Sequence, residues 1–196
     1  QLTIQGEDFE VARIPEAQVN MSPDLKLAIQ KRTIRTNGTV HIPYAKFQPK
    51  DITTAARVSD DAVIVGGEHT PIEKWRIYTR VRLTLGERVS LFGFGFEGRL
   101  GGGLLLEDEP GQLTKATGEL NVPEGRYRAY GQRLTVEYGR LIYTGSPLVN
   151  PALDFRSIRR VGSITAGLKV RGTLNQPSIE LYSIPAMGQT DALSYL

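Results

Sequence analysis

The sequence predicts an all-β protein, a meander of roughly ten to twelve antiparallel strands. Three observations predict it: apolar and polar residues alternate in many short runs, turn-forming residues separate these runs, and helical periodicity is almost absent. The hydrophobic share of 40% and the charged share of 23% are typical of a folded globular chain. We therefore expect a packed sheet rather than a disordered segment.

The clearest alternation lies between Trp75 and Leu85. Apolar side chains occupy most odd positions there and arginine or tyrosine several even ones, which predicts a half-buried strand of about eleven residues. The pattern returns in shorter runs further along the chain: Leu120 and Val122; Leu134, Val136 and Tyr138; Leu153 and Phe155; Leu168 and Val170; Ile179 and Leu181.

Turn chemistry separates these runs. Asn37-Gly38 fits a type I′ hairpin turn. Further breaks are expected at Gly66-Gly67, Pro123-Glu124-Gly125, Ser146-Pro147, Asn150-Pro151 and Asn175-Gln176-Pro177. Helical competitors are few: Ile52 to Arg57 could form a short turn of helix, and Ser22-Pro23-Asp24 resembles a helix start. Neither continues with helical periodicity.

Composition excludes several kinds of site. The chain has no cysteine, which excludes disulfides, thiolate zinc sites and a cysteine nucleophile. The net charge is +3, but the 17 arginines and 7 lysines are spread among acidic residues. We therefore expect no nucleic-acid partner, and assign the arginines to an outer face near anionic lipid headgroups.

Gly93-Phe94-Gly95-Phe96-Glu97-Gly98 matches the dinucleotide-binding string, which requires a following helix. Three more glycines follow instead, so we expect a strand that kinks or approaches another backbone, with Phe92, Phe94 and Phe96 on one face. His41 and His69 stand alone, and Glu107-Asp108-Glu109 is expected to be a solvated turn. No catalytic residue, metal site or cofactor is expected, so the chain is not predicted to be an enzyme.

An apolar sheet face must be covered, and the residues alone leave several solutions open. Without helices, the sheet could close into a sandwich or a barrel, or curl and leave its face for lipid. An outer-membrane barrel is less favoured, because aromatic residues make up only 8% of the chain and form no girdles.

The stretch from Gly118 to Arg160 resembles the TamB C-terminal domain, a family within the AsmA-like bridge-like lipid transfer superfamily. The likeness is specific after Gly111 and weaker over residues 1–110, so we expect one continuous β-groove segment over residues 1–196. The matching residues are Pro123-Glu124-Gly125-Arg126-Tyr127, Ala129-Tyr130-Gly131-Gln132, Gly145-Ser146-Pro147, Asn150-Pro151, Ile158-Arg159, Ala166 to Val170 with Gly172, Pro185-Ala186-Met187 and Ala192 to Leu196.

The resemblance implies a long curled sheet, open along one edge like a folded taco, with an apolar concave interior and a polar exterior. Members of the family are anchored in the inner membrane of Gram-negative bacteria by an N-terminal helix. Their C-terminal end, which runs beyond the position of Leu196, meets TamA, an outer-membrane barrel. The resemblance therefore implies a periplasmic segment that serves outer-membrane biogenesis.

Two functions follow from the resemblance. In the first, the groove binds phospholipid acyl chains and conducts them between the two membranes. In the second, the chain is a scaffold that pairs its strand edges with unfolded outer-membrane β-proteins such as autotransporters. The residues expected to line the groove are Trp75, Ile77, Val81, Leu83, Leu85, Leu120, Val122, Leu134, Val136, Leu153, Phe155, Leu168, Val170, Ile179 and Leu181. The segment after Tyr182 is expected to be held less firmly than the sheet.

Overall fold

The computed structural model describes residues 1–48, 75–93, 95–129 and 131–195. Within these ranges the chain forms one hydrogen-bonded sheet of thirteen strands, which confirms the predicted all-β fold. The strands are β1 (Leu2–Gln5), β2 (Phe9–Ile14), β3 (Ala17–Gln30), β4 (Thr33–Phe47), β5 (Arg76–Gly93), β6 (Phe96–Arg99), β7 (Gly101–Asp108), β8 (Lys115–Asn121), β9 (Gly125–Ala129), β10 (Gln132–Pro147), β11 (Ala152–Val161), β12 (Ile164–Thr173) and β13 (Gln176–Ile184).

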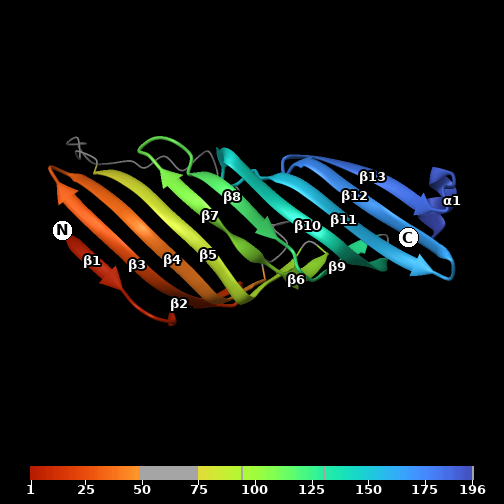
Figure 1. Cartoon of the computed structure of the whole chain (residues 1–196), viewed down its shortest axis with the longest axis horizontal. Helices are drawn as coiled ribbons and strands as arrows, with labels where there is room; N and C mark the ends of the chain where they lie inside the picture. Colours follow the sequence, from red (N-terminus) through yellow and green to blue (C-terminus); the bar gives the residue numbers. More distant parts are fainter. Residues whose placement is uncertain (49–74, 94, 130, 196) are drawn as a thin grey trace, which may run out of the picture.

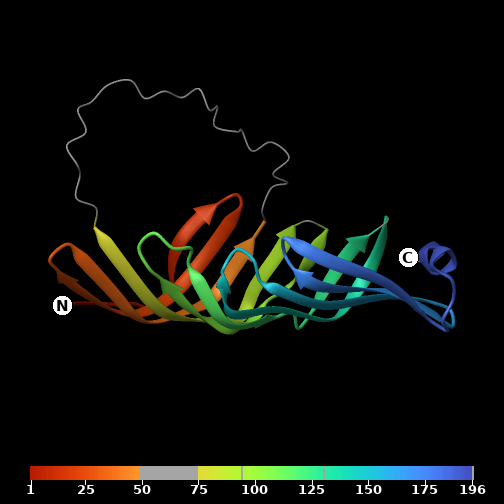
Figure 2. The same ribbon diagram turned by 90° about the horizontal axis from the view of Figure 1, so that it is seen from above.

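The sheet runs along the long axis of the molecule, with the two termini at opposite ends (Figure 1). Its order is β1-β3-β4-β5-β6-β9-β10-β11-β12-β13, and β2 extends β3 beside β1. Two short strand pairs lie between β5 and β10. β7 and β8 join the first half of β5 to the second half of β10, and β6 and β9 join the end of β5 to the start of β10. Seen from above, the strands bend so that their ends rise toward the same side (Figure 2). The predicted curl is therefore present.

One strand pair departs from the predicted antiparallel meander. β4 and β5 pair in parallel, from Thr33 with Arg76 to Phe47 with Leu91. Every other pair in the sheet described by the structure is antiparallel. A parallel pair needs a long connection rather than a hairpin. The sequence offered no turn signal that distinguishes this connection from a hairpin.

The Asn37-Gly38 hairpin prediction is wrong, because both residues lie inside the long strand β4. Gly38 has a φ of +147°, and a side chain there would overlap the carbonyl oxygen of Asp24 on β3. Glycine is therefore required for close approach of two strands rather than for a turn. Ser22-Pro23-Asp24 likewise lies within β3 and starts no helix.

The turn predictions near Pro123, Asn150 and Asn175 are confirmed, since strands end or begin at each of them. At Ser146-Pro147 the strand β10 continues through both residues, and the turn follows them. The described part of the glycine-rich string lies at the β5–β6 hairpin, where Gly93 ends β5 and Phe96 begins β6, and no helix follows it. In this hairpin Gly93 pairs with Phe96, and Phe92 pairs with Glu97. Phe92 and Phe96 therefore face opposite sides of the sheet, contrary to the prediction.

The sequence did not predict the helix that follows the sheet. α1 (Gln189–Ser194) has Gly188 as its N-cap, buries Ala192 and has no side-chain cap. It is drawn at the C-terminal end of the sheet (Figure 2). Among the described residues no helix is long and apolar enough to span a membrane. The predictions for Ile52 to Arg57, Gly66-Gly67, His69 and Phe94 lie outside the described residues.

Candidate functional site

The strand registers place a series of apolar side chains on one face of the sheet. Residues directly opposite each other in a ladder share a face, as do alternate residues along a strand. On neighbouring strands Leu83 pairs with Leu104, Leu104 with Gly118, and Gly118 with Tyr143. Further along, Phe155 pairs with Val170, which pairs with Ile179. We call this side of the sheet the apolar face.

A hollow of about 350 Å³ lies on the apolar face. It brings together residues from β5 and from β13, which are separated by five intervening strands in the sheet order. Only the side toward which the sheet curls can bring such distant strands to one hollow. Its lining is mostly apolar: Leu91, Gly93, Phe96, Leu100, Val122, Tyr127, Val136, Leu141, Leu153, Phe155, Ser157, Val170, Leu174, Pro177 and Ile179. We call this the apolar hollow.

The structure places the fifteen predicted groove residues in three groups. Six of them, Val122, Val136, Leu153, Phe155, Val170 and Ile179, line the apolar hollow. Leu134 and Leu168 are buried on the same face with Ala166, and Leu181 packs against them. The remaining six lie outside the hollow: Val81, Leu83, Leu85, Ile77 and Trp75 at β5, and Leu120 on β8. Trp75 and Ile77 are 54% and 47% exposed.

Two buried clusters flank the apolar hollow. The C-terminal cluster consists of Leu134, Ala166 and Leu168, with Tyr127, Leu181 and Tyr195 packed against it. The central cluster consists of Leu104, Ala116 and Tyr143, with Leu106, Leu120, Leu141 and Leu148 around it. Burial raises the pKa of the Tyr143 phenol, because the ionised form loses its hydration. These side chains fill the sheet's own core and leave the hollow between the clusters.

Sequence reasoning missed the lining residue Leu141 because of a β-bulge in β10. The register of β10 against β11 shifts between Val136 and Tyr138. After the shift the apolar face continues with Gly139 and Leu141, while Tyr138 turns to the other face and is 38% exposed. The predicted run of Leu134, Val136 and Tyr138 is therefore wrong at its last member. The sequence did contain a signal of this shift. Apolar residues occupy even positions up to Val136 and an odd position at Leu141.

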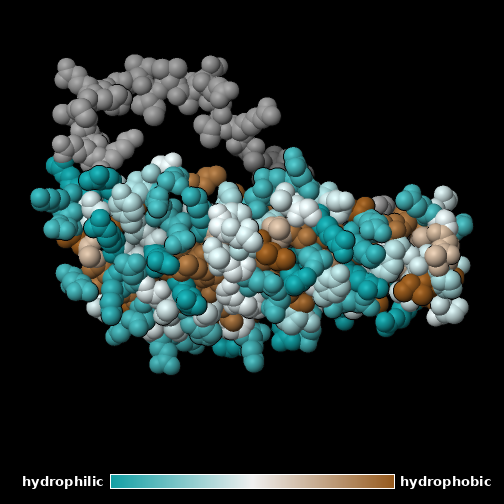
Figure 3. Space-filling view, turned by 45° about the horizontal axis from the view of Figure 1, so that its top comes forward, coloured by the Kyte–Doolittle hydropathy of each residue, from teal (hydrophilic) through white to brown (hydrophobic). Residues whose placement is uncertain are grey.

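The opposite face carries polar pairs between neighbouring strands. Arg156 forms an ion pair with Glu137 at 3.0 Å, and its Nε donates a hydrogen bond to the Tyr182 hydroxyl at 2.6 Å. The Tyr182 ring is also 5.0 Å from the Lys169 ammonium, at cation–π distance. Arg140 pairs with Asp154 across β10 and β11. In the view of Figure 3 hydrophilic side chains cover most of the surface, with hydrophobic ones in scattered patches.

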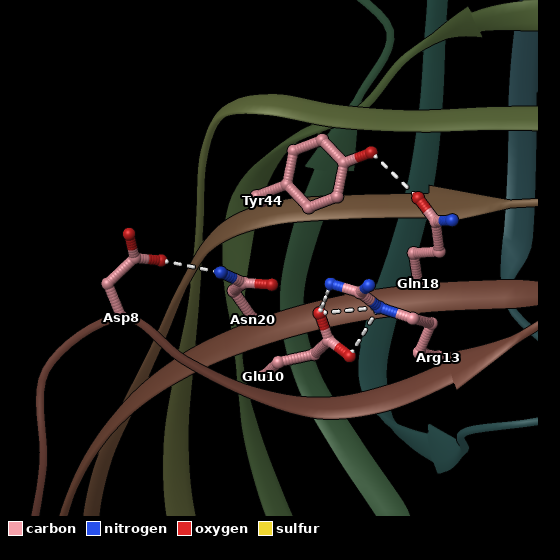
Figure 4. A network of polar contacts seen from close by, with 6 residues as sticks. All are labelled: Asp8, Glu10, Arg13, Gln18, Asn20 and Tyr44. Atoms are coloured by element: carbon pink, nitrogen blue, oxygen red, sulfur yellow. Dashed lines mark hydrogen bonds and ion pairs between the residues drawn. The ribbon is translucent and has the colours of Figure 1, made fainter.

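A second candidate site is a polar network at the N-terminal end of the sheet (Figure 4). Glu10 on β2 binds Arg13 at 2.5 Å, Asp8 accepts a hydrogen bond from Asn20, and Tyr44 donates one to Gln18. Its carboxylates thus already have partners within the network, and Arg13 is largely exposed. One contact lies within β2, one joins β3 to the residue just before β2, and one joins β3 to β4. Strand pairing therefore explains the network, which offers no catalytic arrangement.

Together, the curled sheet and its apolar hollow define an all-β protein built on one large curled sheet. The model of the TamB C-terminal domain matches residues 1–196, and the chain belongs to this family. It is 30% identical over 215 residues to a curated relative, "Translocation and assembly module subunit TamB" of Haemophilus influenzae. The match covers 100% of this chain and 16% of the relative, so the chain spans less than a fifth of that protein's length.

Proposed function

We propose that the chain is a non-enzymatic periplasmic segment of a translocation and assembly module, and that its apolar hollow binds phospholipid acyl chains. The name of the Haemophilus relative supports the module. The observation that carries the lipid proposal is the apolar hollow itself. Its volume of about 350 Å³ falls within the range of small-molecule sites. In this proposal the parent protein is anchored in the inner membrane, and an outer-membrane barrel of the TamA type is its partner.

Acyl chains suit this hollow for an energetic reason. Each buried methylene contributes about 0.8 kcal/mol, so ten inserted methylenes contribute roughly 8 kcal/mol before ordering costs. The attraction is nondirectional, so an apolar face that extends over many strands allows a chain to slide without one deep energy minimum. Ile179 is 62% exposed although it lines the hollow, which leaves its side chain available to a ligand.

A pair of neighbouring substitutions tests this function. Ile179→Asp places a carboxylate in the apolar hollow, whereas Ser178→Asp places it on the opposite face of the same strand. Both positions are exposed, so neither change disturbs the buried clusters. Burial of an unpaired carboxylate costs several kcal/mol, comparable with the binding energy of the acyl chain. We expect copurified phospholipid in native mass spectra of wild type and Ser178→Asp, and little with Ile179→Asp. Equal lipid in all three would contradict the proposal.

A second candidate function is a scaffold for the assembly of autotransporters and other outer-membrane β-barrel proteins. The observation that favours it is the edge strand β13, which pairs only with β12 among the strands that the structure describes. An unpaired edge offers backbone groups to another strand. Edge pairing depends on backbone groups rather than on the side chain at one position. If the chain is a scaffold, the full-length parent with Ile179→Asp should still assemble β-barrel substrates. If it is a lipid conduit, this is not expected.

A further inference from the structure

The segment after β13 folds back over the apolar face. Arg159 pairs with Ala166 and Ala166 with Ser183, so the three residues share one face of β11, β12 and β13. Ser183 Oγ accepts a hydrogen bond from the Met187 amide, and Arg159 donates one to the Tyr195 carbonyl oxygen. Tyr195 also packs against the C-terminal cluster, of which Ala166 is a member. The helix α1 therefore lies on the side toward which the sheet curls (Figure 2).

The part of the sheet that this segment covers continues the apolar hollow. Ser157, two residues before Arg159 on β11, lines the hollow, and alternate residues of a strand share a face. Ser157 pairs with Leu168, and Leu168 with Leu181. Tyr127 lines the hollow and also packs against the C-terminal cluster. One unbroken apolar surface thus runs from the hollow to a region that we call the covered strip, formed by Leu134, Ala166, Leu168 and Leu181.

The helix α1 depends on the sheet for its stability. It has six residues and no side-chain cap, and a helix this short is unstable alone. It is held by burial of Ala192, which is 2% exposed, by packing of Tyr195 and by the hydrogen bond from Arg159 at 3.1 Å. Apolar contact is nondirectional, so an acyl chain could cover the same strip as well as the Tyr195 ring does. The helix and an acyl chain are therefore competing occupants of one surface.

We propose that the covered strip is an extension of the apolar hollow for acyl chains, and that α1 is a cover that a long acyl chain displaces. This inference rests on the proposed lipid function. By molecular volume, a decanoyl chain is smaller than the hollow of about 350 Å³, whereas a palmitoyl chain is larger. The palmitoyl chain therefore reaches the covered strip, which it can occupy only after α1 has moved away.

The test uses lysophosphatidylcholine, which carries one acyl chain, in a decanoyl and a palmitoyl form, each below its critical micelle concentration. Hydrogen exchange of the Ala192 amide reports on α1, because this amide donates a hydrogen bond to the Gly188 carbonyl oxygen at 2.9 Å. Exchange is measured by NMR in the wild-type protein without ligand and with each lipid. Calorimetric titration gives the affinity of both lipids for wild type, for Tyr195→Ala and for Tyr195→Phe, the matched control that keeps the ring.

We expect the palmitoyl lipid to speed exchange at Ala192 at least about fivefold, and the decanoyl lipid to leave it unchanged. Tyr195→Ala should bind the palmitoyl lipid about tenfold more tightly than wild type, because a larger fraction of the molecules is open. Tyr195→Phe should bind it as wild type does. The decanoyl lipid should bind equally to all three proteins.

The outcomes separate the cover from the lipid function. If the palmitoyl lipid binds while exchange at Ala192 stays the same or slows, the cover is overturned and the apolar hollow remains a lipid site. Equal affinity of Tyr195→Ala and wild type for a bound palmitoyl lipid overturns the cover in the same way. If neither lipid binds to any of the three proteins, the proposed lipid function is overturned, and the cover with it.

Discussion

The ring of Phe155 on β11 lies directly over Gly139 on β10. The two residues are ladder partners, and a methyl group at position 139 would lie 2.5 Å from Cε1 of Phe155. The missing side chain thus lets the aromatic ring lie flat on the sheet, where it forms part of the lining of the apolar hollow.

Gly139→Ala should therefore displace Phe155 and destabilise the sheet. Overpacking of this kind costs about 1–3 kcal/mol in the free energy of unfolding, which urea denaturation measures. Gly188→Ala is the matched control, because a methyl group there would lie 3.6 Å from its nearest neighbour, an ordinary contact. A Gly139→Ala variant as stable as Gly188→Ala would show that the ring adapts without cost.

Tyr182 should contribute more to stability than an exposed tyrosine on the same face. It packs over Gly167, accepts a hydrogen bond from Arg156 and lies beside Lys169. Tyr182→Ala is expected to cost about 2–4 kcal/mol in the free energy of unfolding, since these contacts and the buried ring area are lost together. Tyr138→Ala, at a residue that is 38% exposed, should cost much less in the same measurement. Similar losses in the two variants would contradict the role of the Tyr182 cluster.

Alkaline pH should destabilise the central cluster through Tyr143. In the unfolded chain the phenol loses its proton near pH 10.0, and burial raises the pKa in the folded protein. The stabilising effect of the neutral phenol is therefore complete below pH 10 and is lost as pH rises above it. We expect the free energy of unfolding, measured between pH 9 and 11, to fall less steeply in Tyr143→Phe than in wild type. Parallel profiles would exclude Tyr143 as a source of the pH dependence.

The helix α1 should be held to the sheet by Tyr195. This residue packs against the C-terminal cluster, and Arg159 donates a hydrogen bond to its carbonyl oxygen at 3.1 Å. Tyr195→Ala should speed hydrogen exchange at Ala192 by about tenfold or more, because local opening becomes easier. Leu193→Ala is the control, since Leu193 is 44% exposed on the same helix. Equally fast exchange at Ala192 in wild type would instead agree with the sequence-based expectation of a loosely held end.

The alternation of residues was sufficient to predict an all-β chain and many of the residues on the apolar face. It failed where the backbone departs from regular geometry. The bulge at Glu137 moves Tyr138 off the apolar face and brings Leu141 onto it, and alternation assumes that no such shift occurs. Gly38 was predicted in a turn because Asn-Gly favours one, yet it lies within β4 opposite Leu25, and its close approach to Asp24 depends on the register with the neighbouring strand β3.

The apolar hollow could not be derived from local patterns for the same reason. It exists because the curl brings the end of β5 close to β13, a relationship between distant strands. The helix α1 was missed because six residues without a side-chain cap carry little intrinsic helical signal. Its stability comes from the packing of Ala192 and Tyr195.

The parallel ladder between β4 and β5 has a consequence for the order in which the sheet assembles. Pairs across the β3–β4 hairpin are close in sequence, beginning with Gln30 and Thr33. Each rung between β4 and β5, by contrast, closes a loop of roughly 40 residues or more, at a higher entropic cost. Contacts between distant residues form slowly, so the antiparallel blocks β1–β4 and β5–β13 should form first as separate kinetic units. The joining of these blocks along β4 and β5 would then be the slow step that completes the groove.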